Sequence, residues 1–424
     1  MSPRAGRVPR LLLNFLEVER RRVCLYTSPE LKGDGSSACI FPYRGVYSVQ
    51  IMEKYSEPER IYAYQYKSVS HSLFDKVFRY WLNYAFRFIP PAMSANLLSM
   101  TGNLGSWFAL ILLVVLGDRV DLPHHRIVFA LASFSVFFYH TVDNLDGRQA
   151  KRAGSCGPLG EFVDHWFDSF NVFFFPLGAI AAFPVIPLSW GIAIIILAGI
   201  ADWLALREVM KTNVMYFGPV STDEGIFVYW ALLFFISILG YDFWAAPLPG
   251  IGIPPIGIVV FGVGLNFIYQ IFRVLITYRF MGLREILVES LYYIPIILWI
   301  VATAPVLGER FALISGLLAI GFTGSRHVGD LLRVRLTGLA LPRFYPDLAI
   351  CLLFMLSVLF VNAIILPLPA WLLLFPMVVL FVDTAHALVL QFMRTVRRVY
   401  ECLGVTLFGT SPERAVAVEP VIQK

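Results

Sequence analysis

One stretch of the sequence, Asp143 to Asp168, combines the residue types that a metal-dependent reaction would need. It holds four aspartates and lies between two strongly apolar segments. A carboxylate at membrane depth costs about 2.5–3.5 kcal/mol on insertion scales, so an acidic cluster there is a functional hypothesis by default. Several such groups need a balancing positive charge, and a divalent cation is its simplest source. The stretch therefore predicts a metal-dependent membrane enzyme.

The spacing of the aspartates places them in two pairs. Residues four apart in a helix differ by about 40° in direction, so Asp164 and Asp168 share a face. Asp143 and Asp146 are three apart and project from the end of the preceding apolar segment. If the two helices pack side by side, the carboxylates converge. Mg²⁺ and Mn²⁺ are hard ions that prefer such oxygen ligands.

Small and basic residues in the same stretch suit a phosphate group. Gly147 and Gly160 lack a side chain where a phosphate would come close. Arg148, Lys151 and Arg152 offer cationic partners for a pyrophosphate.

Glu161 and His165 form another pair four residues apart, turned by about 100° from the aspartate face. A carboxylate beside a histidine orients it and raises its basicity, so His165 suits a general base acting on a hydroxyl. Asp168 is the alternative base. The competing interpretation of the whole stretch is a polar helix interface or an ion path, with aspartates paired to nearby Lys and Arg.

The elements that position this stretch are predicted to be membrane helices. The chain has 424 residues, of which 58% are hydrophobic and 15% charged, whereas a soluble domain carries about 45–50% apolar and 25% charged residues. We expect an all-α polytopic membrane protein. About 20 apolar residues span a bilayer, and about ten such segments follow Pro91. They are 96–116, 126–143, 160–183, 187–208, 224–242, 254–275, 286–305, 309–332, 345–365 and 369–394.

The segment before the first span is predicted to be an interfacial amphipathic helix. Phe74, Phe78 and Trp81 recur at helical spacing, with Lys76 and Arg79 off that face. A helix packed in a soluble core is the alternative. The predicted organisation is a cytoplasmic tail (1–56), the amphipathic helix (57–90), a catalytic transmembrane core (91–275), C-terminal transmembrane helices (276–398) and a second cytoplasmic tail (399–424).

The distribution of charge predicts the orientation. Residues 1–90 hold fourteen Lys and Arg against eight Asp and Glu, which suits anionic lipid headgroups better than nucleic acid. Loops after even-numbered spans carry most of the remaining basic residues, Arg333 and Arg335 among them, so both termini are expected in the cytoplasm. The five cysteines show no CxxC spacing, which indicates neither a disulfide framework nor a thiolate metal site.

Polar residues elsewhere in the apolar segments are expected to be structural. A hydrogen bond between helices explains them better than a substrate contact. Arg326 lies at a span's end beside His327, where snorkelling to the interface explains the arginine. The residues assigned to helix contacts are Asp202, Glu289, Asp383 and His386.

The central stretch resembles a known family. The signature of the CDP-alcohol phosphotransferases is D-x2-D-G-x2-A-R-x8-G-x3-D-x3-D. This sequence is similar to it at Asp143, Asp146-Gly147, Ala150-Lys151, Gly160, Asp164 and Asp168. Lys151 replaces the arginine, which keeps the charge but loses bidentate phosphate geometry.

The surroundings resemble the choline/ethanolamine phosphotransferase branch of that family. That branch has DGKQARR, PLGELFDHG and DS, and this chain has DGRQAKR, PLGEFVDHW and DS. Trp166 stands where the branch has glycine, and a bulky ring there would reshape the acceptor or headgroup pocket. Ser94 to Gly102 resembles the APNxITLxG motif, which makes Asn96 a candidate nucleotide contact.

The resemblance implies an activity and a set of partners. The expected reaction transfers phosphoethanolamine or phosphocholine from CDP-ethanolamine or CDP-choline to the hydroxyl of diacylglycerol, releasing CMP. Two Mg²⁺ or Mn²⁺ ions would be held by the four aspartates, and Glu161 with His165 would form the base. A homodimer is implied, in the endoplasmic reticulum of a eukaryote or the inner membrane of a bacterium. The implied substrate-binding residues are Asn96, Gly147, Arg148, Ala150, Lys151 and Gly160.

Two other functions compete with this one. A CDP-diacylglycerol-dependent phosphatidyltransferase would use a related site, but Glu161, His165 and the number of spans argue against it. A divalent-cation transporter could use the acidic cluster as its ion site. Internal repeats are not evident, which disfavours a transporter built on them.

Overall fold

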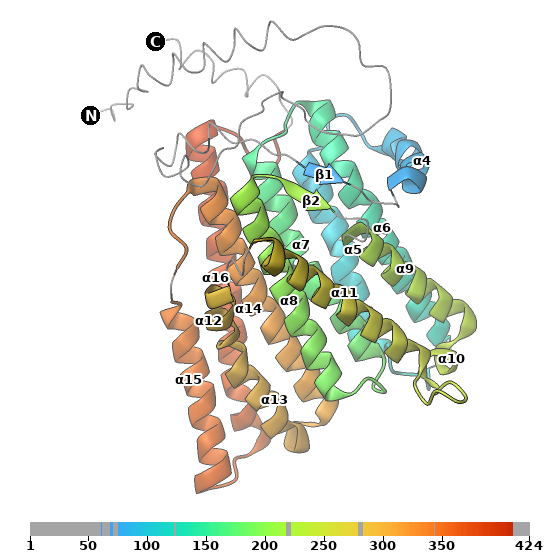
Figure 1. The fold of residues 1–424 in the computed structure, drawn as a ribbon, viewed down its shortest axis with the longest axis vertical. Helices are drawn as coiled ribbons and strands as arrows, with labels where there is room; N and C mark the ends of the chain where they lie inside the picture. Colours follow the sequence, from blue (N-terminus) through green and yellow to red (C-terminus); the bar gives the residue numbers. More distant parts are fainter. Residues whose placement is uncertain are drawn as a thin grey trace, which may run out of the picture.

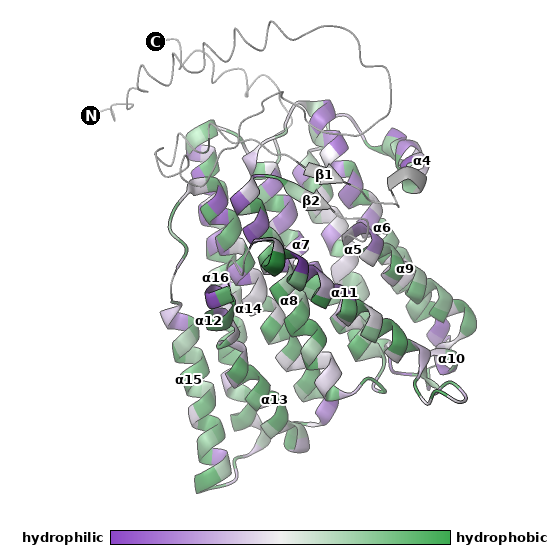
Figure 2. Cartoon of the chain, in the orientation of Figure 1, coloured by the Kyte–Doolittle hydropathy of each residue, from purple (hydrophilic) through white to green (hydrophobic). Residues whose placement is uncertain are grey.

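The computed structural model describes residues 61, 68–70, 75–122, 124–217, 222–278, 283–342 and 344–409. The tail expected at 1–56 lies outside the described residues, as does the tail expected at 399–424 beyond residue 409. Long helices run roughly side by side in the described part (Figure 1). Hydrophilic residues gather mostly at the end that carries the strands β1 and β2 (Figure 2).

A helix occupies each segment that was expected to span the membrane. The helices are α5 (Ala95–Leu116), α6 (His125–Ala153), α7 (Pro158–Ala182), α8 (Leu188–Thr212), α9 (Thr222–Leu239), α11 (Pro255–Thr277), α12 (Leu283–Ser290) with α13 (Tyr293–Leu307), α14 (Glu309–Thr337), α15 (Pro346–Phe360) with the π-helical η2 (Val361–Ile365), and α16 (Ala370–Leu403). The short helix α10 (Tyr241–Ala245) follows α9.

Most of these helices have the length and composition of membrane spans. Within the described residues, nine helical segments qualify, with α12 and α13 taken together. The helix α7 is not among them, because its first half carries acidic residues and a histidine. It nevertheless packs against α5, α8 and α14 in the middle of the bundle. The predicted class, an all-helical polytopic membrane protein, is confirmed.

The segment before α5 differs from the long helix that was predicted. Its helical part is α4 (Asp75–Ala85), followed by the short 3₁₀ turn η1 (Phe86–Phe88). Ser68–Ser70 forms the strand β1 instead, paired in parallel with β2 (Met215–Phe217). The prediction of one helix over 57–90 was therefore wrong at these residues, because a partner far along the chain satisfies the strand's backbone groups.

The helix α4 is attached to α6. Phe78 and Leu82 are buried together with Leu145 of α6. The indole nitrogen of Trp81 donates a hydrogen bond to Thr141 Oγ1 at 3.0 Å. Tyr80 is 80% exposed on the other side of the helix. The amphipathic pattern thus places one face of α4 on the bundle.

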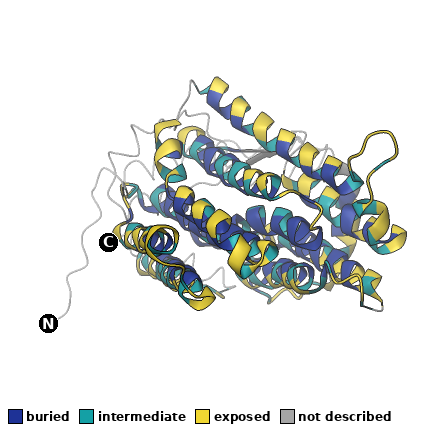
Figure 3. Ribbon diagram, turned by 90° about the horizontal axis from the view of Figure 1, so that it is seen from below, coloured by how far each residue is buried: buried dark blue, intermediate teal, exposed yellow. Residues whose placement is uncertain are grey.

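Small residues let the central helices approach one another closely. A Cβ atom added at Gly105 of α5 would lie 2.9 Å from the carbonyl oxygen of Ser135 in α6. One added at Gly324 of α14 would lie 2.4 Å from Phe173 of α7. Glycine at such positions allows tight helix contacts in membranes. Seen from the end of the bundle, buried residues face inward and exposed residues face outward (Figure 3).

Candidate active site

The turn between α6 and α7 brings the two pairs of aspartates together. Gly154 ends α6 with a φ of 65°, a left-handed conformation that glycine adopts at little cost. Pro158 then stands in the first turn of α7, where its missing N–H is tolerated. The chain reverses within these few residues, and α5 packs against both helices. The end of α6 therefore faces the start of α7.

The aspartates form two groups that could each hold a metal ion. Ligand atoms of Asp143, Asp146 and Asp164 lie within 4.8 Å of one another. The same holds for ligand atoms of Asp164, His165 and Asp168. Asp164 belongs to both groups, so the predicted convergence of the four carboxylates is observed.

The donor set fits a hard divalent cation. Carboxylate oxygens dominate both groups, as Mg²⁺ and Mn²⁺ prefer. Asp143 Oδ1 is buried and has no hydrogen-bond partner among the described residues. A buried oxygen of this kind costs free energy unless a partner satisfies it. A cation between the carboxylates would supply that partner and offset their mutual repulsion.

Neutral polar residues of α5 and α7 form a chain of hydrogen bonds that ends at the acidic cluster. The hydroxyl of Ser99 donates a hydrogen bond to Asp146 Oδ2. Asn103 Nδ2 donates to the carbonyl oxygen of Ser99 at 3.0 Å, and Asn171 Nδ2 of α7 donates to Asn103 Oδ1 at 2.7 Å. Ser106 completes the chain of contacts by donating to Asn171 Oδ1 at 2.6 Å.

Sequence analysis missed these supporting residues, although a signal was present. Ser99, Asn103 and Ser106 recur at helical spacing within an otherwise apolar segment, and such a stripe marks one polar face. Tyr139 of α6 was also missed. Its hydroxyl donates to Asp168 Oδ1 at 2.8 Å, which fixes the direction of that carboxylate.

Glu161 forms an ion pair with Arg335 of α14. The side chains are 5% and 4% exposed, respectively. Arg335 was expected in a loop beyond the span 309–332. That assignment was wrong, because α14 continues to Thr337 and buries the arginine. His165 lies on the next turn of α7, with Nδ1 3.9 Å from Asp164 Oδ2.

The two glycines expected near a phosphate have free space beside them among the described residues. A Cβ atom added at Gly147 would meet nothing within 4 Å. One added at Gly160 would meet only Asn96 Oδ1, at 3.7 Å. Protein packing therefore does not require glycine at either position, whereas it does at Gly105.

Of the other residues expected to bind substrate, Asn96 lies beside Gly160. Asn96 Nδ2 donates to the carbonyl oxygen of Leu407, at 2.8 Å, so the segment after α16 lies beside it. Arg148 donates to Asn83 Oδ1 of α4 at 2.7 Å. Ala150 and Lys151 are in the last turns of α6, where their carbonyl oxygens accept hydrogen bonds from Ser155 and Gly154.

Arg152, by contrast, contacts the segment before α5. Its Nη2 donates to the carbonyl oxygen of Ile89 at 2.8 Å, and the guanidinium lies 4.3 Å from the centre of the Phe86 ring. This arginine, expected as a pyrophosphate partner, is thus engaged in holding η1 against α6.

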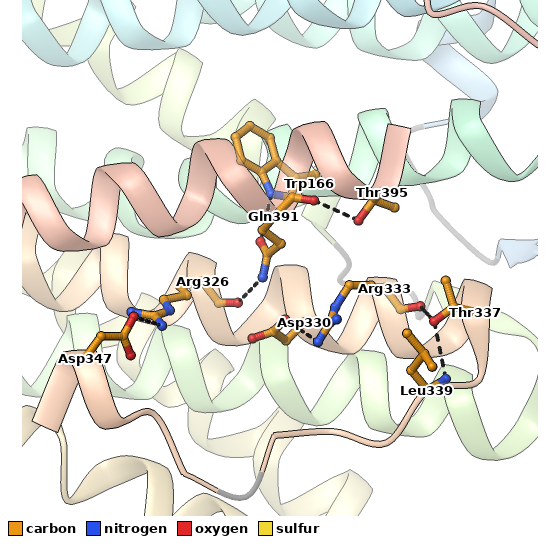
Figure 4. A network of polar contacts seen from close by, with 9 residues as sticks. All are labelled: Trp166, Arg326, Asp330, Arg333, Thr337, Leu339, Asp347, Gln391 and Thr395. Carbon is orange, nitrogen blue, oxygen red and sulfur yellow. Dashed lines mark hydrogen bonds and ion pairs between the residues drawn. The ribbon is translucent and has the colours of Figure 1, made fainter. Parts of the chain in front are cut away.

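Trp166 points toward α16 (Figure 4). Its indole nitrogen donates to Gln391 Oε1 at 3.1 Å, and its ring lies 4.8 Å from that of Phe392. Gln391 Nε2 in turn donates to the carbonyl oxygen of Arg326, at 3.0 Å. The ring that was expected to reshape a substrate pocket therefore takes part in a contact among α7, α14 and α16.

Comparison with known proteins bears on this site. Residues 92–251 match the family model of the CDP-alcohol phosphatidyltransferases. This stretch is a CDP-alcohol phosphatidyltransferase domain. The resemblance noted in the sequence is thereby confirmed for a region that contains the four aspartates, Glu161 and His165.

Individual relatives match the same part of the chain. The chain is 31% identical over 191 residues to uncharacterized CDP-alcohol phosphatidyltransferase class-I family protein 3 of Dictyostelium discoideum, covering 44% of this chain and 47% of that protein. It is 23% identical over 223 residues to cholinephosphotransferase 1 of Xenopus laevis, covering 52% and 56%. Mouse cholinephosphotransferase 1 is 26% identical over 182 residues, covering 43% and 46%. The matches thus span about half the length of these curated relatives.

Proposed function

We propose that this protein transfers phosphoethanolamine or phosphocholine from a CDP-alcohol to the hydroxyl of diacylglycerol and releases CMP. The observation that carries the proposal is the pair of ligand groups that share Asp164 inside the matched domain. Glu161 and His165, one and two turns into α7, supply the general base that such a transfer needs.

The aspartates would hold two Mg²⁺ or Mn²⁺ ions. Asp143, Asp146 and Asp164 form one site, and Asp164 with Asp168 forms the other. Bound there, the cations would polarise the pyrophosphate and neutralise charge on the departing CMP. Gly147 and Gly160 leave room for the pyrophosphate, because no side chain fills the space beside them.

The proposed reaction is a displacement at the phosphorus that carries the amino alcohol. The acceptor oxygen forms a bond to this phosphorus, and the bond from the phosphorus to the bridging oxygen breaks. The electron pair of the broken bond leaves with CMP. His165 takes the hydroxyl proton. Asp168 ranks second as a base, because Tyr139 already donates to it and this proposal uses its carboxylate to hold a metal ion.

The choice between the two headgroups is left open in this proposal. The named relatives in frog and mouse are cholinephosphotransferases, which supports choline, but both identities are low.

We also propose that both termini are cytoplasmic, following the distribution of Lys and Arg. The membrane would be the endoplasmic reticulum in a eukaryote or the inner membrane in a bacterium, and the homodimer stays a prediction.

The test is an assay of the purified full chain in lipid nanodiscs. Labelled CDP-ethanolamine and CDP-choline are supplied separately with diacylglycerol and Mg²⁺ or Mn²⁺, and labelled phospholipid and CMP are measured. We expect labelled phospholipid and CMP to form in equal amounts. Neither should form after chelation of the metal, and both should form again when the metal is added back. D164N is the matched inactive control.

Two outcomes would replace this proposal with another. Product formed only from CDP-diacylglycerol and a polar alcohol would identify a phosphatidyltransferase of the other type. Metal flux in proteoliposomes without any nucleotide reaction would identify a divalent-cation transporter.

A further inference from the structure

We infer that Arg335 is a positioning residue for Glu161, and through it for the proposed base His165. This inference rests on the proposed function. Arg335 lies outside the matched domain of 92–251, so the site would be incomplete without a helix from the C-terminal part of the chain. The residue is in the last turn of α14, which packs against α7.

Burial of the pair is the first argument. Arginine is almost never fully buried unless it is paired, and the Arg335 side chain is 4% exposed with Glu161 as an ion-pair partner. Guanidinium is permanently charged, so it offsets the cost of removing the Glu161 carboxylate from water. The ion pair therefore holds the Glu161 carboxylate beside the Arg335 guanidinium.

The direction of the contact is the second argument. Other arginines of α14 make ion pairs elsewhere: Arg333 pairs with Asp330 one turn away on the same helix, at 3.0 Å. Arg335 instead forms its ion pair with Glu161 of α7, which stands four residues before His165. Residues four apart share a helix face, so His165 lies on the same face of α7 as the carboxylate that the arginine holds.

The consequence for the reaction concerns turnover more than nucleotide binding. Among the proposed nucleotide contacts, Gly147 is on α6, Asn96 on α5 and Gly160 on α7, and none is on α14. Removing the guanidinium would leave a buried carboxylate without its counter-charge, and Glu161 would move or take a proton. His165 would lose its support, while the CDP-alcohol would still bind.

The experiment compares R335M with R333M in the full chain. Loss of a residue that supports a metal ligand typically costs about 10- to 100-fold, and we take the same scale for a residue that supports the proposed base. We expect R335M to lower kcat by that factor, with KM for the CDP-alcohol changed less than about twofold, and R335K to recover part of the loss. R333M, two residues away, should keep the wild-type kcat.

Protein stability and coupling are measured alongside. Protection of each variant from thermal unfolding by CMP and Mn²⁺ reports binding without turnover, and R335M should keep it. If R335M does not fold, R335K and the double variant E161Q/R335M take its place. The double variant should be no less active than E161Q, because the arginine acts through Glu161.

The outcomes separate this inference from the function on which it rests. A wild-type chain that does not use CDP-alcohols overturns the proposed function and the inference together. An active wild type with an unchanged kcat in R335M overturns the inference alone. So does an additive loss in E161Q/R335M, or a tenfold rise in KM at constant kcat.

Discussion

Two of the regions that bury charged residues differ in how the charges are balanced. At the ends of α6 and α7, carboxylates face carboxylates: ligand atoms of Asp143, Asp146 and Asp164 lie within 4.8 Å of one another. Among α14, α15 and α16, carboxylates face an arginine. Arg326 Nη2 lies 2.6 Å from Asp347 Oδ2, and Nη1 lies 3.4 Å from Asp383 Oδ2.

The difference separates a site from a structural contact. A buried arginine between two carboxylates is compensated within the protein, so it joins helices without any ligand. Figure 4 shows its contact with Asp347. Clustered carboxylates are not compensated by one another, and an external cation would have to balance them. Burial of charge alone therefore does not indicate a metal site in a membrane protein; the sign of the neighbouring charges does.

The largest expected effect of a substitution is at Asp164. Because both ligand groups include this residue, D164N should lower kcat/KM by about 1000-fold, which corresponds to about 4 kcal/mol. Thermal unfolding without metal should be unchanged, but the stabilisation by Mn²⁺ should vanish. D347N is the control from the balanced region and should keep its activity. Retention of the Mn²⁺ effect in D164N would show that the metal binds elsewhere.

Arg326 should matter for stability and not for chemistry. Removing one partner from a buried ion pair costs about 3–5 kcal/mol. The side chains of Asp347 and Asp383 are 44% and 20% exposed, so R326M should lower the free energy of unfolding by less than that amount. Unfolding by denaturant in detergent measures it. D347N should cost less, because the side chain of Asp347 is 44% exposed. A fall in kcat per folded R326M molecule would link this region to the reaction.

The glycines offer a comparison between a ligand-facing and a packing position. In a helix interior, replacing glycine by alanine stabilises by about 1 kcal/mol where space allows. G147A should therefore unfold at a slightly higher temperature, yet raise KM for the CDP-alcohol by about tenfold, since the methyl group would occupy the space for phosphate. G105A should instead destabilise the protein, because its Cβ would lie 2.9 Å from Ser135 O. An unchanged KM in G147A would remove the glycine from the proposed phosphate site.

A substitution at Trp166 should have only a small effect on catalysis. W166F keeps an aromatic ring beside Phe392 but leaves the amide oxygen of Gln391 without its donor. An unsatisfied buried group costs about 1–3 kcal/mol, so stability should fall by that amount, with kcat changed less than about threefold. A shift of more than tenfold in the preference between CDP-choline and CDP-ethanolamine would mean that the ring contacts the headgroup after all.

Some polar residues were interpreted correctly from the sequence and others were not. Asp383 was assigned to a helix contact, and its ion pair with Arg326 confirms that role. Arg326 itself was expected to snorkel to the interface, which was wrong, since it is buried between two helices that carry acidic residues. Glu289 contacts His327 at 3.7 Å. Asp202 Oδ2 is buried and has no hydrogen-bond partner among the described residues, and the expected helix contact of Asp202 stays a prediction.

The sequence by itself determined the helices and the composition of the site. Twenty-residue apolar segments must form helices in a bilayer, and a spacing of three or four residues puts Asp143 with Asp146, and Asp164 with Asp168, on common faces. Tertiary structure alone decided the partners: Arg335 for Glu161, Gln391 for Trp166, and β2 for β1. These partners lie far apart in the chain, and helical periodicity specifies a direction around one axis but not which neighbouring helix stands in that direction.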